Sequence, residues 1–222
     1  MIERPDNLTD LVFAEIRDRI VNASLPPGSP VSEAALAKEL AVSKTPVREA
    51  LLRMRRIGLV EPTSRGLRVT LASVRSVRQA FEYRAALESQ AATYAAHHAT
   101  GEQLDAVAYW ASESLHHARG GDPAGFRRAD QQFHEAMARA SGNEYMRLAI
   151  EDAFVLTVAL RRRDVSLVRD FVPDAVEHLA IAGALRARDS VGASTSLAQH
   201  ALRIMDQLLD AMRRPDATVS AG

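Results

Sequence analysis

The sequence predicts a mainly α-helical protein with two domains: a small first domain of three helices and a β-ribbon, followed by an all-α bundle of six helices. Three observations support this prediction. Apolar residues recur every three or four positions through most of the chain, as they do in amphipathic helices. Short β-like segments occur only between residues 59 and 71. The length of 222 residues exceeds what one small domain needs and is too short for three.

The first domain is expected to span residues 1–72 and begins with three helices. Apolar residues at helical spacing predict the first helix over residues 8–21, and the turn-forming segment LPPGSP ends it. Ser32 is placed to cap a short second helix, SEAALAKEL, which ends near residue 41. Ser43 opens a third helix, which reaches about residue 57 before Gly58 stops it.

Two β-like segments, LVEP and LRVTL, follow this helix and are joined by the turn residues 63–66. Helix, helix, tight turn, helix and β-ribbon is the element order of a winged helix-turn-helix, whose third helix enters the major groove of DNA. The 28 basic and 28 acidic residues of the whole chain cancel. Between residues 43 and 68, however, seven basic residues stand against two acidic ones, a net charge of +5. A charge run alone is usually a solvated surface, so DNA binding is inferred from element order and charge together.

The second domain is expected to span residues 73–214 and to leave a mobile tail at residues 215–222. It shows no strand pattern, and caps, glycines and prolines mark where its helices start and stop. The spacing of apolar residues predicts six helices, over residues 73–98, 101–119, 122–140, 143–165, 170–188 and 190–213. These helices predict an all-α bundle with a core of Leu, Val, Ala and Phe.

Polar residues that face the interior of this bundle form the candidate functional site. Asp130 and His134 are four positions apart on the apolar stripe of one predicted helix. His178 and His200 lie on the apolar stripes of two others. Each buried polar group without a partner costs about 1 to 3 kcal/mol, so the four must satisfy one another or something bound between them. A single inward histidine is more often a hydrogen-bonded core residue, but four converging groups favour a divalent metal.

Other features of the sequence exclude some kinds of metal site. The chain has no cysteine, which excludes disulfides, thiolate catalysis and cysteine-ligated zinc. Glu113 and His116 form one E-x-x-H motif, whereas a di-iron bundle needs two. The remaining histidines neighbour polar residues or a helix end and are expected on the surface: His97, His98, His116 and His117.

The segment PGSPVSEAALAKELAVSKTPVREALLRMRRIGLVEPTSRGLRV resembles the DNA-binding domain of GntR-type bacterial transcription regulators, with its Leu-Ala pair, recognition helix, G-L-V and wing glycine. The resemblance implies that DNA is contacted by Ser43, Lys44, Thr45, Arg48, Arg65 and Gly66. Two positions depart from the family pattern: Lys44 stands where arginine is usual, and Ala34 where some members have a base-reading arginine. Arg53, Arg55 and Arg56 are expected to form a solvated helix end rather than base contacts.

The pattern D-x-x-F-H, then S-G-N, then EHLAIAGALRARD and a last histidine resembles the FCD effector domain of the FadR-like branch of the same family, over residues 75–213. Its six helices are similar to the VanR-type subgroup. In metal-dependent members the matching residues bind a divalent cation, which implies the same for Asp130, His134, His178 and His200. Ligation rich in nitrogen favours zinc or nickel, with manganese as a further option.

Arg84 and Glu88 also face the interior, and their i, i+4 spacing allows a simple ion pair. The family pattern R-x-x-x-E implies instead that Arg84 holds the carboxylate of an effector whose other end is bound by the metal. Acyl-CoA-binding members lack the metal residues, which argues against a fatty-acyl ligand. Four protein ligands leave open positions on an octahedral metal, so a small organic acid is expected.

The sequence therefore predicts a homodimeric, metabolite-responsive transcription regulator that binds an inverted-repeat operator, and repression is the commoner behaviour in the family it resembles. The alternatives are a metal-dependent hydrolase and a regulator whose metal is purely structural. An enzyme is not expected, because no convincing general base accompanies the site. The start MIERPDNLTD lacks an apolar signal region, and no apolar run approaches the roughly 20 residues of a membrane helix. A cytoplasmic protein without a membrane partner is therefore expected.

Overall fold

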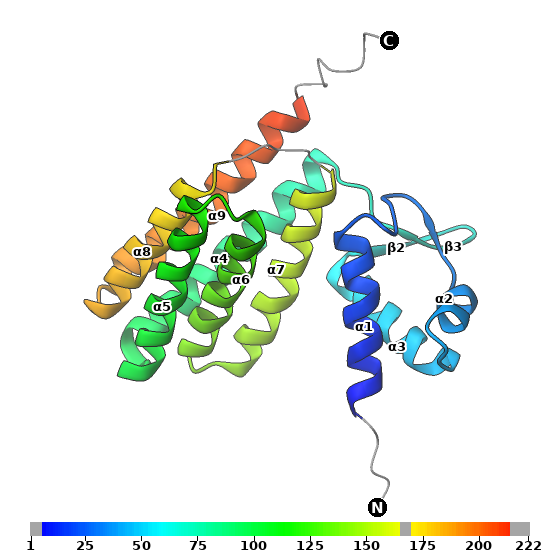
Figure 1. Ribbon diagram of the computed structural model, residues 1–222, viewed down its shortest axis with the longest axis horizontal. Coiled ribbons are helices and arrows are strands. Elements are labelled where there is room, and N and C mark those ends of the chain that lie inside the picture. The colour runs from blue at the N-terminus through cyan, green and yellow to red at the C-terminus, as the bar shows by residue number, and fades with distance from the viewer. Residues whose placement is uncertain (1–5, 165–169, 214–222) are drawn as a thin grey trace, which may run out of the picture. The chain divides into compact units, whose positions relative to one another are not determined.

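The computed structural model describes residues 6–164 and 170–213, which hold nine helices and three short strands (Figure 1). These residues form two compact units. The first contains the residues up to Val74 together with the end of one long helix from Leu156 onward. The second runs from Arg75 to Val155 and includes the last two helices. No helix in the described part of the chain is both long enough and apolar enough to span a bilayer.

The first unit combines three helices with a small antiparallel sheet, and its elements are α1 (Asp6–Val21), β1 (Pro30–Val31), α2 (Glu33–Glu39), α3 (Lys44–Ile57), β2 (Val60–Thr63) and β3 (Gly66–Val69). The strand order is β1-β3-β2, so β3 is central and pairs Leu67 with Val31 on one side and with Pro62 on the other. Ile16 of α1 and Met54 of α3 lie in the core with no exposed surface. This is the predicted winged helix-turn-helix.

Local signals explain most of these boundaries, with two corrections. Ser32 caps α2 by accepting a hydrogen bond from the Ala35 backbone at 3.3 Å, and Gly58 ends α3 with a φ of 94°. Ser43 lies at the N-cap of α3 as predicted, but its side chain makes no capping hydrogen bond. Strand β1 was not predicted, because two residues show no periodicity; its Pro30 has no N–H and fits only an edge strand.

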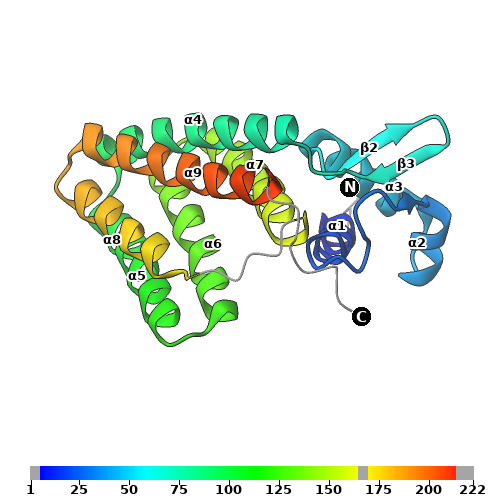
Figure 2. The same cartoon turned by 90° about the horizontal axis from the view of Figure 1, so that it is seen from above.

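The second unit consists of helices, and the remaining elements are α4 (Val74–His98), α5 (Gly101–Arg119), α6 (Pro123–Ala140), α7 (Glu144–Asp164), α8 (Val172–Arg186) and α9 (Ser190–Arg213). Helix α5 lies against α6 and α8, and α8 lies against α9 (Figure 2). Thr100 forms a capping box with Gln103 at the start of α5, and Asp122 caps α6. The predicted mainly α fold, a winged helix-turn-helix followed by a six-helix bundle, is confirmed.

The bundle core is rich in alanine, whose small side chain lets helices approach closely. Four alanines on one face of α4 are at most 1% exposed: Ala91, Ala92, Ala95 and Ala96. Larger residues fill the space between α5, α6 and α8, among them Phe133, Met137 and Ile181, which are fully buried. Polar residues interrupt this apolar interior where α4, α6, α8 and α9 carry the candidate site.

Candidate metal centre and DNA-reading surface

The four predicted metal ligands converge in the interior of the second unit. Asp130 and His134 lie one turn apart on α6, His178 lies on α8 and His200 on α9. Each offers one ligand atom, and these atoms all lie within 4.8 Å of one another. The four residues are at most 4% exposed. Three imidazoles and one carboxylate thus share a small buried volume, as the stripe positions in the sequence predicted.

Two of the ring nitrogens that face the centre of this cluster, in His178 and His200, have spare hydrogen-bonding capacity. Asp130 Oδ1 lies 3.6 Å from His134 Nε2 and 3.5 Å from His178 Nε2, which is too long for good hydrogen bonds. The Nε2 atoms of His178 and His200 are buried without any hydrogen-bond partner. Because a buried unpaired nitrogen costs about 1 to 3 kcal/mol, a bound cation would stabilise this arrangement.

Hydrogen bonds at the Nδ1 atoms of His178 and His200 determine which ring nitrogen carries the proton. The Ser114 hydroxyl donates to the Ala111 carbonyl at 2.7 Å, so in its 3.1 Å contact with His178 Nδ1 it must accept. The carboxylate of Glu177 lies 2.7 Å from His200 Nδ1 and can only accept when ionised. Both histidines therefore carry hydrogen on Nδ1 and direct the Nε2 lone pair inward, as metal ligands do.

His134 reaches the same state through Arg84. Arg84 Nη2 lies 2.9 Å from His134 Nε2, and because a guanidinium only donates, Nε2 must offer its lone pair. On the other side of the ring, Nδ1 lies 2.9 Å from Glu88 Oε1, within ion-pair distance but with a direction unsuited to a hydrogen bond. Arg84 Nε also pairs with Glu88 Oε1 at 3.1 Å, and its guanidinium carbon lies 4.6 Å from the Phe154 ring centroid.

Arg84 and Glu88 therefore face the interior as predicted, with 2% and 0% of their surface exposed. The simple ion pair, one of the two sequence alternatives, is present. Arg84 nevertheless also lines the centre of the cluster, because its Nη2 contacts the inward nitrogen of His134. A carboxylate bound at the centre would lie beside a fixed cation.

Electrostatics at the site favours neutral imidazoles at His178 and His200 and an ionised carboxylate at Glu88. Burial lowers the pKa of His178 well below its ordinary value and also lowers that of His200, which keeps both in the neutral form that binds metals. Burial raises the pKa of Glu88, but Arg84 and then His134 outweigh it and bring that pKa to about 2. Burial lowers the pKa of His134 as it does for the other two histidines. The negative charge of Glu88 outweighs burial, so the pKa of His134 is raised overall.

The other histidines lie outside the cluster. His97, His98 and His116 are exposed, as predicted. His117 is half-buried rather than fully exposed, because its Nδ1 lies 3.0 Å from Asp122 Oδ2 at the start of α6. Sequence reasoning missed three residues that contact the site or its neighbours: Ser114, Glu177 and Arg203. Each acts on a residue of another helix, and no local spacing signals such a pair.

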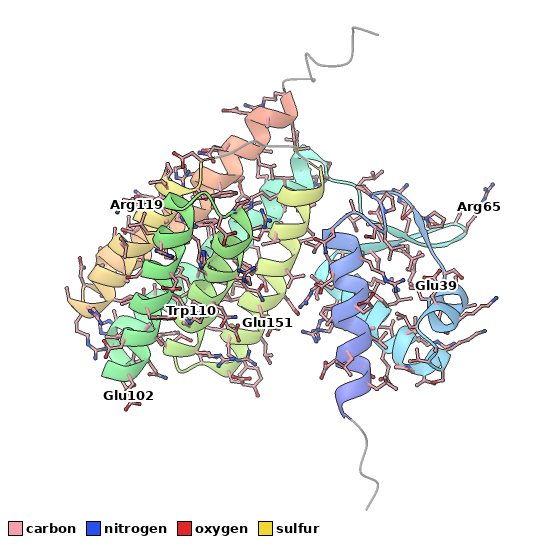
Figure 3. All side chains as sticks on the ribbon, viewed as in Figure 1. Glu39, Arg65, Glu102, Trp110, Arg119 and Glu151 are labelled. Carbon is pink, nitrogen blue, oxygen red and sulfur yellow. The ribbon has the colours of Figure 1, made fainter. Side chains whose placement is uncertain are left out.

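The first unit presents the residues implied by the resemblance on its surface. Four of them are exposed at the start of α3: Ser43, Lys44, Thr45 and Arg48. Arg65 projects from the turn between β2 and β3 (Figure 3), and Gly66 follows it with a φ of 127°. A groove of about 300 Å³ beside α3 is lined in part by Arg48, Leu67 and Gly66. A helix N-terminus with hydroxyls and cations suits phosphate.

Two of the three arginines in the second half of α3 are exposed, and one is not simply solvated. Arg55 and Arg56 are exposed, in keeping with the predicted solvated helix end. Arg53 is half-buried: its guanidinium carbon lies 4.0 Å from the Phe13 ring centroid, and its Nη1 lies 3.5 Å from Asp10 Oδ1 of α1. Arg53 therefore packs onto α1 within the unit.

Two family descriptions match the two parts of this chain. "Bacterial regulatory proteins, gntR family" matches residues 8–66, which include the exposed start of α3. "FCD domain" matches residues 79–203, which include the buried Asp and His cluster. Among solved structures, E. coli McbR/YncC has a TM-score of 0.77 at 21% identity, over 95% of this chain and 99% of that one, and it shares the fold.

Relatives at higher identity are named as transcription regulators. The Probable D-xylose utilization operon transcriptional repressor of Paenarthrobacter nicotinovorans is 32% identical, over 95% of this chain and 94% of that protein. The HTH-type transcriptional repressor RspR of Escherichia coli (strain K12) is 27% identical, over 89% and 87%. These relatives confirm the expectation of a DNA-binding regulator rather than an enzyme and remove the hydrolase alternative. The chain belongs to the GntR family of bacterial regulatory proteins, in the branch that carries an FCD domain.

Proposed function

We propose that this regulator is a homodimeric repressor whose affinity for an inverted-repeat operator is changed by a small organic acid, bound at a divalent metal in the second unit. The observation that supports this most strongly is the cluster of four buried ligand atoms within 4.8 Å, with three imidazoles in the tautomer that metals bind.

The residues that would hold the ion are Asp130, His134, His178 and His200. Local charge supports a divalent cation. The carboxylates and guanidinium groups alone, four against two, leave a net charge of −2 around the cluster, from Glu88, Asp130, Asp174, Glu177, Arg84 and Arg203. Nitrogen-rich ligation favours zinc or nickel, and manganese is a further option.

The residue that would recognise the acid is Arg84. It is 2% exposed, and its Nη2 lies 2.9 Å from the inward nitrogen of His134. A guanidinium is suited to a carboxylate because it donates two parallel hydrogen bonds. A bound metal would supply a Lewis-acidic position for a second oxygen of the same acid. The Phe154 ring lies 4.6 Å from the guanidinium carbon of Arg84 and supports it by a cation–π contact.

Operator binding is assigned to the exposed surface of the winged helix. Ser43, Lys44 and Thr45 lie at the start of α3, where backbone N–H groups also face outward to phosphates. Arg48 is the residue best placed to read a guanine, and Arg65 with Gly66 would follow the backbone or minor groove from the wing. Repression is proposed because the two relatives described above are named repressors.

Metal analysis combined with an acid screen tests this function. Purified wild-type protein should bind zinc or nickel, His178→Ala should lose most of that metal, and His116→Ala should keep it because His116 is exposed. Far-UV circular dichroism shows whether each variant remains folded. Organic acids that raise the melting temperature of the metal-loaded protein should also change operator binding in a gel-shift assay. Metal uptake without any acid-dependent change in operator binding would indicate a purely structural ion.

A further inference from the structure

A chain of ion pairs lies on the outer side of the metal cluster. Glu177 precedes the proposed ligand His178 on α8, but its Oε2 lies 2.7 Å from Nδ1 of His200 on α9. Arg203, three residues after His200, holds both oxygens of this carboxylate, with Nε 2.6 Å from Oε1 and Nη2 2.7 Å from Oε2. Arg203 Nη2 also donates to Asp174, which is 1% exposed on α8.

This geometry fixes the carboxylate of Glu177 in direction as well as in position. Two parallel hydrogen bonds from one guanidinium set the plane of a carboxylate. The plane in turn sets where Oε2 meets His200, and so the orientation of the imidazole ring. With the guanidinium of Arg203 on both of its oxygens, the Glu177 carboxylate accepts the Nδ1 hydrogen of His200.

We propose that Glu177 is a positioning residue that sets the metal affinity of the site through His200, and that Arg203 and Asp174 hold Glu177 in place. The inference rests on the proposed metal site. A carboxylate that accepts from the outer nitrogen fixes the tautomer of a histidine ligand and makes its inner nitrogen more basic. Ser114 orients His178 in the same manner but supplies no charge. Glu177 therefore makes the inner nitrogen of His200 a stronger metal ligand than Ser114 makes that of His178.

Glu177 also gives a cleaner test than Glu88, the other carboxylate beside a histidine. Glu88 is fully buried, so its removal would take the counter-charge at 3.1 Å away from the guanidinium of Arg84 in the core. The side chains of Glu177 and Arg203 are 34% and 30% exposed, so water can solvate what remains after a substitution. Glu177→Gln keeps the shape of the side chain and removes its charge.

The test measures the dissociation constant for zinc in the full-length protein, by competition with a chromophoric chelator near neutral pH. Glu177→Gln should weaken zinc binding about 10- to 100-fold. Arg203→Ala should weaken it less, because the carboxylate is retained without its clamp. The matched control is Glu135→Gln, which removes a half-buried carboxylate of α6 that pairs with Arg139 and makes no contact with the ring of a proposed ligand, and it should leave zinc affinity unchanged.

Melting temperatures of the metal-free proteins separate positioning from simple stabilisation. A purely structural role would lower the melting temperature of Glu177→Gln but leave its zinc affinity equal to that of wild type, and that result would overturn the inference alone. Wild-type protein that binds no zinc, nickel or manganese would overturn the proposed metal site, and the role of Glu177 would fall with it. Weaker zinc binding in Glu177→Gln, with Glu135→Gln unchanged, supports the inference.

Discussion

Arg48 meets Glu33 with one edge of its guanidinium group, through Nε to Oε2 at 3.1 Å and Nη2 to Oε1 at 2.8 Å. A guanidinium carries five N–H groups, so the edge formed by Nη1 and the second hydrogen of Nη2 can still donate to a base. The Arg48 side chain is 64% exposed, and without this ion pair it would sample many rotamers. If Arg48 reads a guanine as proposed, this pair would preorganise it for two hydrogen bonds to the major-groove edge of that base.

Arg48→Ala should weaken binding to the cognate operator roughly 10- to 100-fold, because a bidentate base contact would be lost, and should leave the fold intact. A gel-shift titration with the operator and a scrambled duplex measures this effect. Arg53→Ala is the matched control on the same helix, since Arg53 packs on Phe13 and should affect stability more than sequence preference. The same operator preference in Arg48→Ala and wild type would refute base reading by Arg48.

At the scale of one element, the start of α6 shows how a helix cap carries a pH dependence. Asp122 Oδ1 accepts hydrogen bonds from the backbone of Gly125 at 2.9 Å and of Ala124 at 3.1 Å. These bonds, that from Gly125 first, lower the pKa of Asp122 below its ordinary value. Because the folded-state pKa lies below the unfolded one, the ionised cap adds stability above the unfolded pKa. This contribution is lost as pH falls through the folded pKa.

Asp122→Asn should keep an acceptor for the cap and remove its titration. Wild type should therefore be more stable than the variant near pH 5, and the difference in free energy of unfolding should shrink as pH is lowered towards about 3. Urea denaturation of both proteins across this range measures the difference. A difference that stays constant with pH would mean that the charge of Asp122 does not contribute to the cap.

The elements that could be predicted are those whose signals are local. Thr100 and Asp122 predict helix starts because each caps the helix that begins at the next residue. The spacing of apolar residues predicts which face of each helix is buried. Strand β1 could not be predicted, because Val31 becomes a strand residue only by pairing with Leu67 of β3. The lack of a capping hydrogen bond from the Ser43 side chain also could not be predicted, since a serine at an N-cap usually bonds the backbone.

Some features of the candidate site could likewise be predicted from the sequence, and others could not. Asp130 and the three histidines could be predicted to face inward because each lies on the apolar stripe of its own helix. The contacts of Glu177 with His200 and of Arg84 with His134 could not, because they join side chains of different helices. Their existence depends on how those helices are rotated and shifted against each other, which sequence spacing within one helix does not determine.

At the scale of the whole molecule, two helices connect the candidate site to the first unit along the chain. Helix α7 is continuous, yet its residues up to Val155 belong to the second unit and those from Leu156 onward to the first. Phe154, which lies against the guanidinium of Arg84, is the second residue before this boundary. Helix α4 carries Arg84 and follows β3 after a short link. A ligand that moves Arg84 would therefore act on both α4 and α7.

Removal of the Arg84 charge should abolish the response of operator binding to the acid. Arg84→Ala alone would leave the Glu88 carboxylate buried without its cation, at a cost of about 3 to 5 kcal/mol. The combined change Arg84→Met and Glu88→Gln removes both charges and should keep the protein folded. This variant should bind operator nearly as wild type does when it is assayed at a saturating metal concentration, but its gel shift should no longer respond to the acid. A wild-type response would show that Arg84 does not bind the effector.

The two units, if coupled, must obey thermodynamic reciprocity. An acid can change operator affinity only through its different affinities for the DNA-bound and the free protein, so operator must change acid affinity by the same factor, typically about 5- to 150-fold. For a repressor that the acid releases, calorimetric titration of the metal-loaded protein should give weaker acid binding in the presence of operator. The factor should match the loss of operator affinity that saturating acid causes in gel shifts. Equal acid affinities with and without operator would mean that the units are not coupled, and the metal would then serve only to stabilise the bundle.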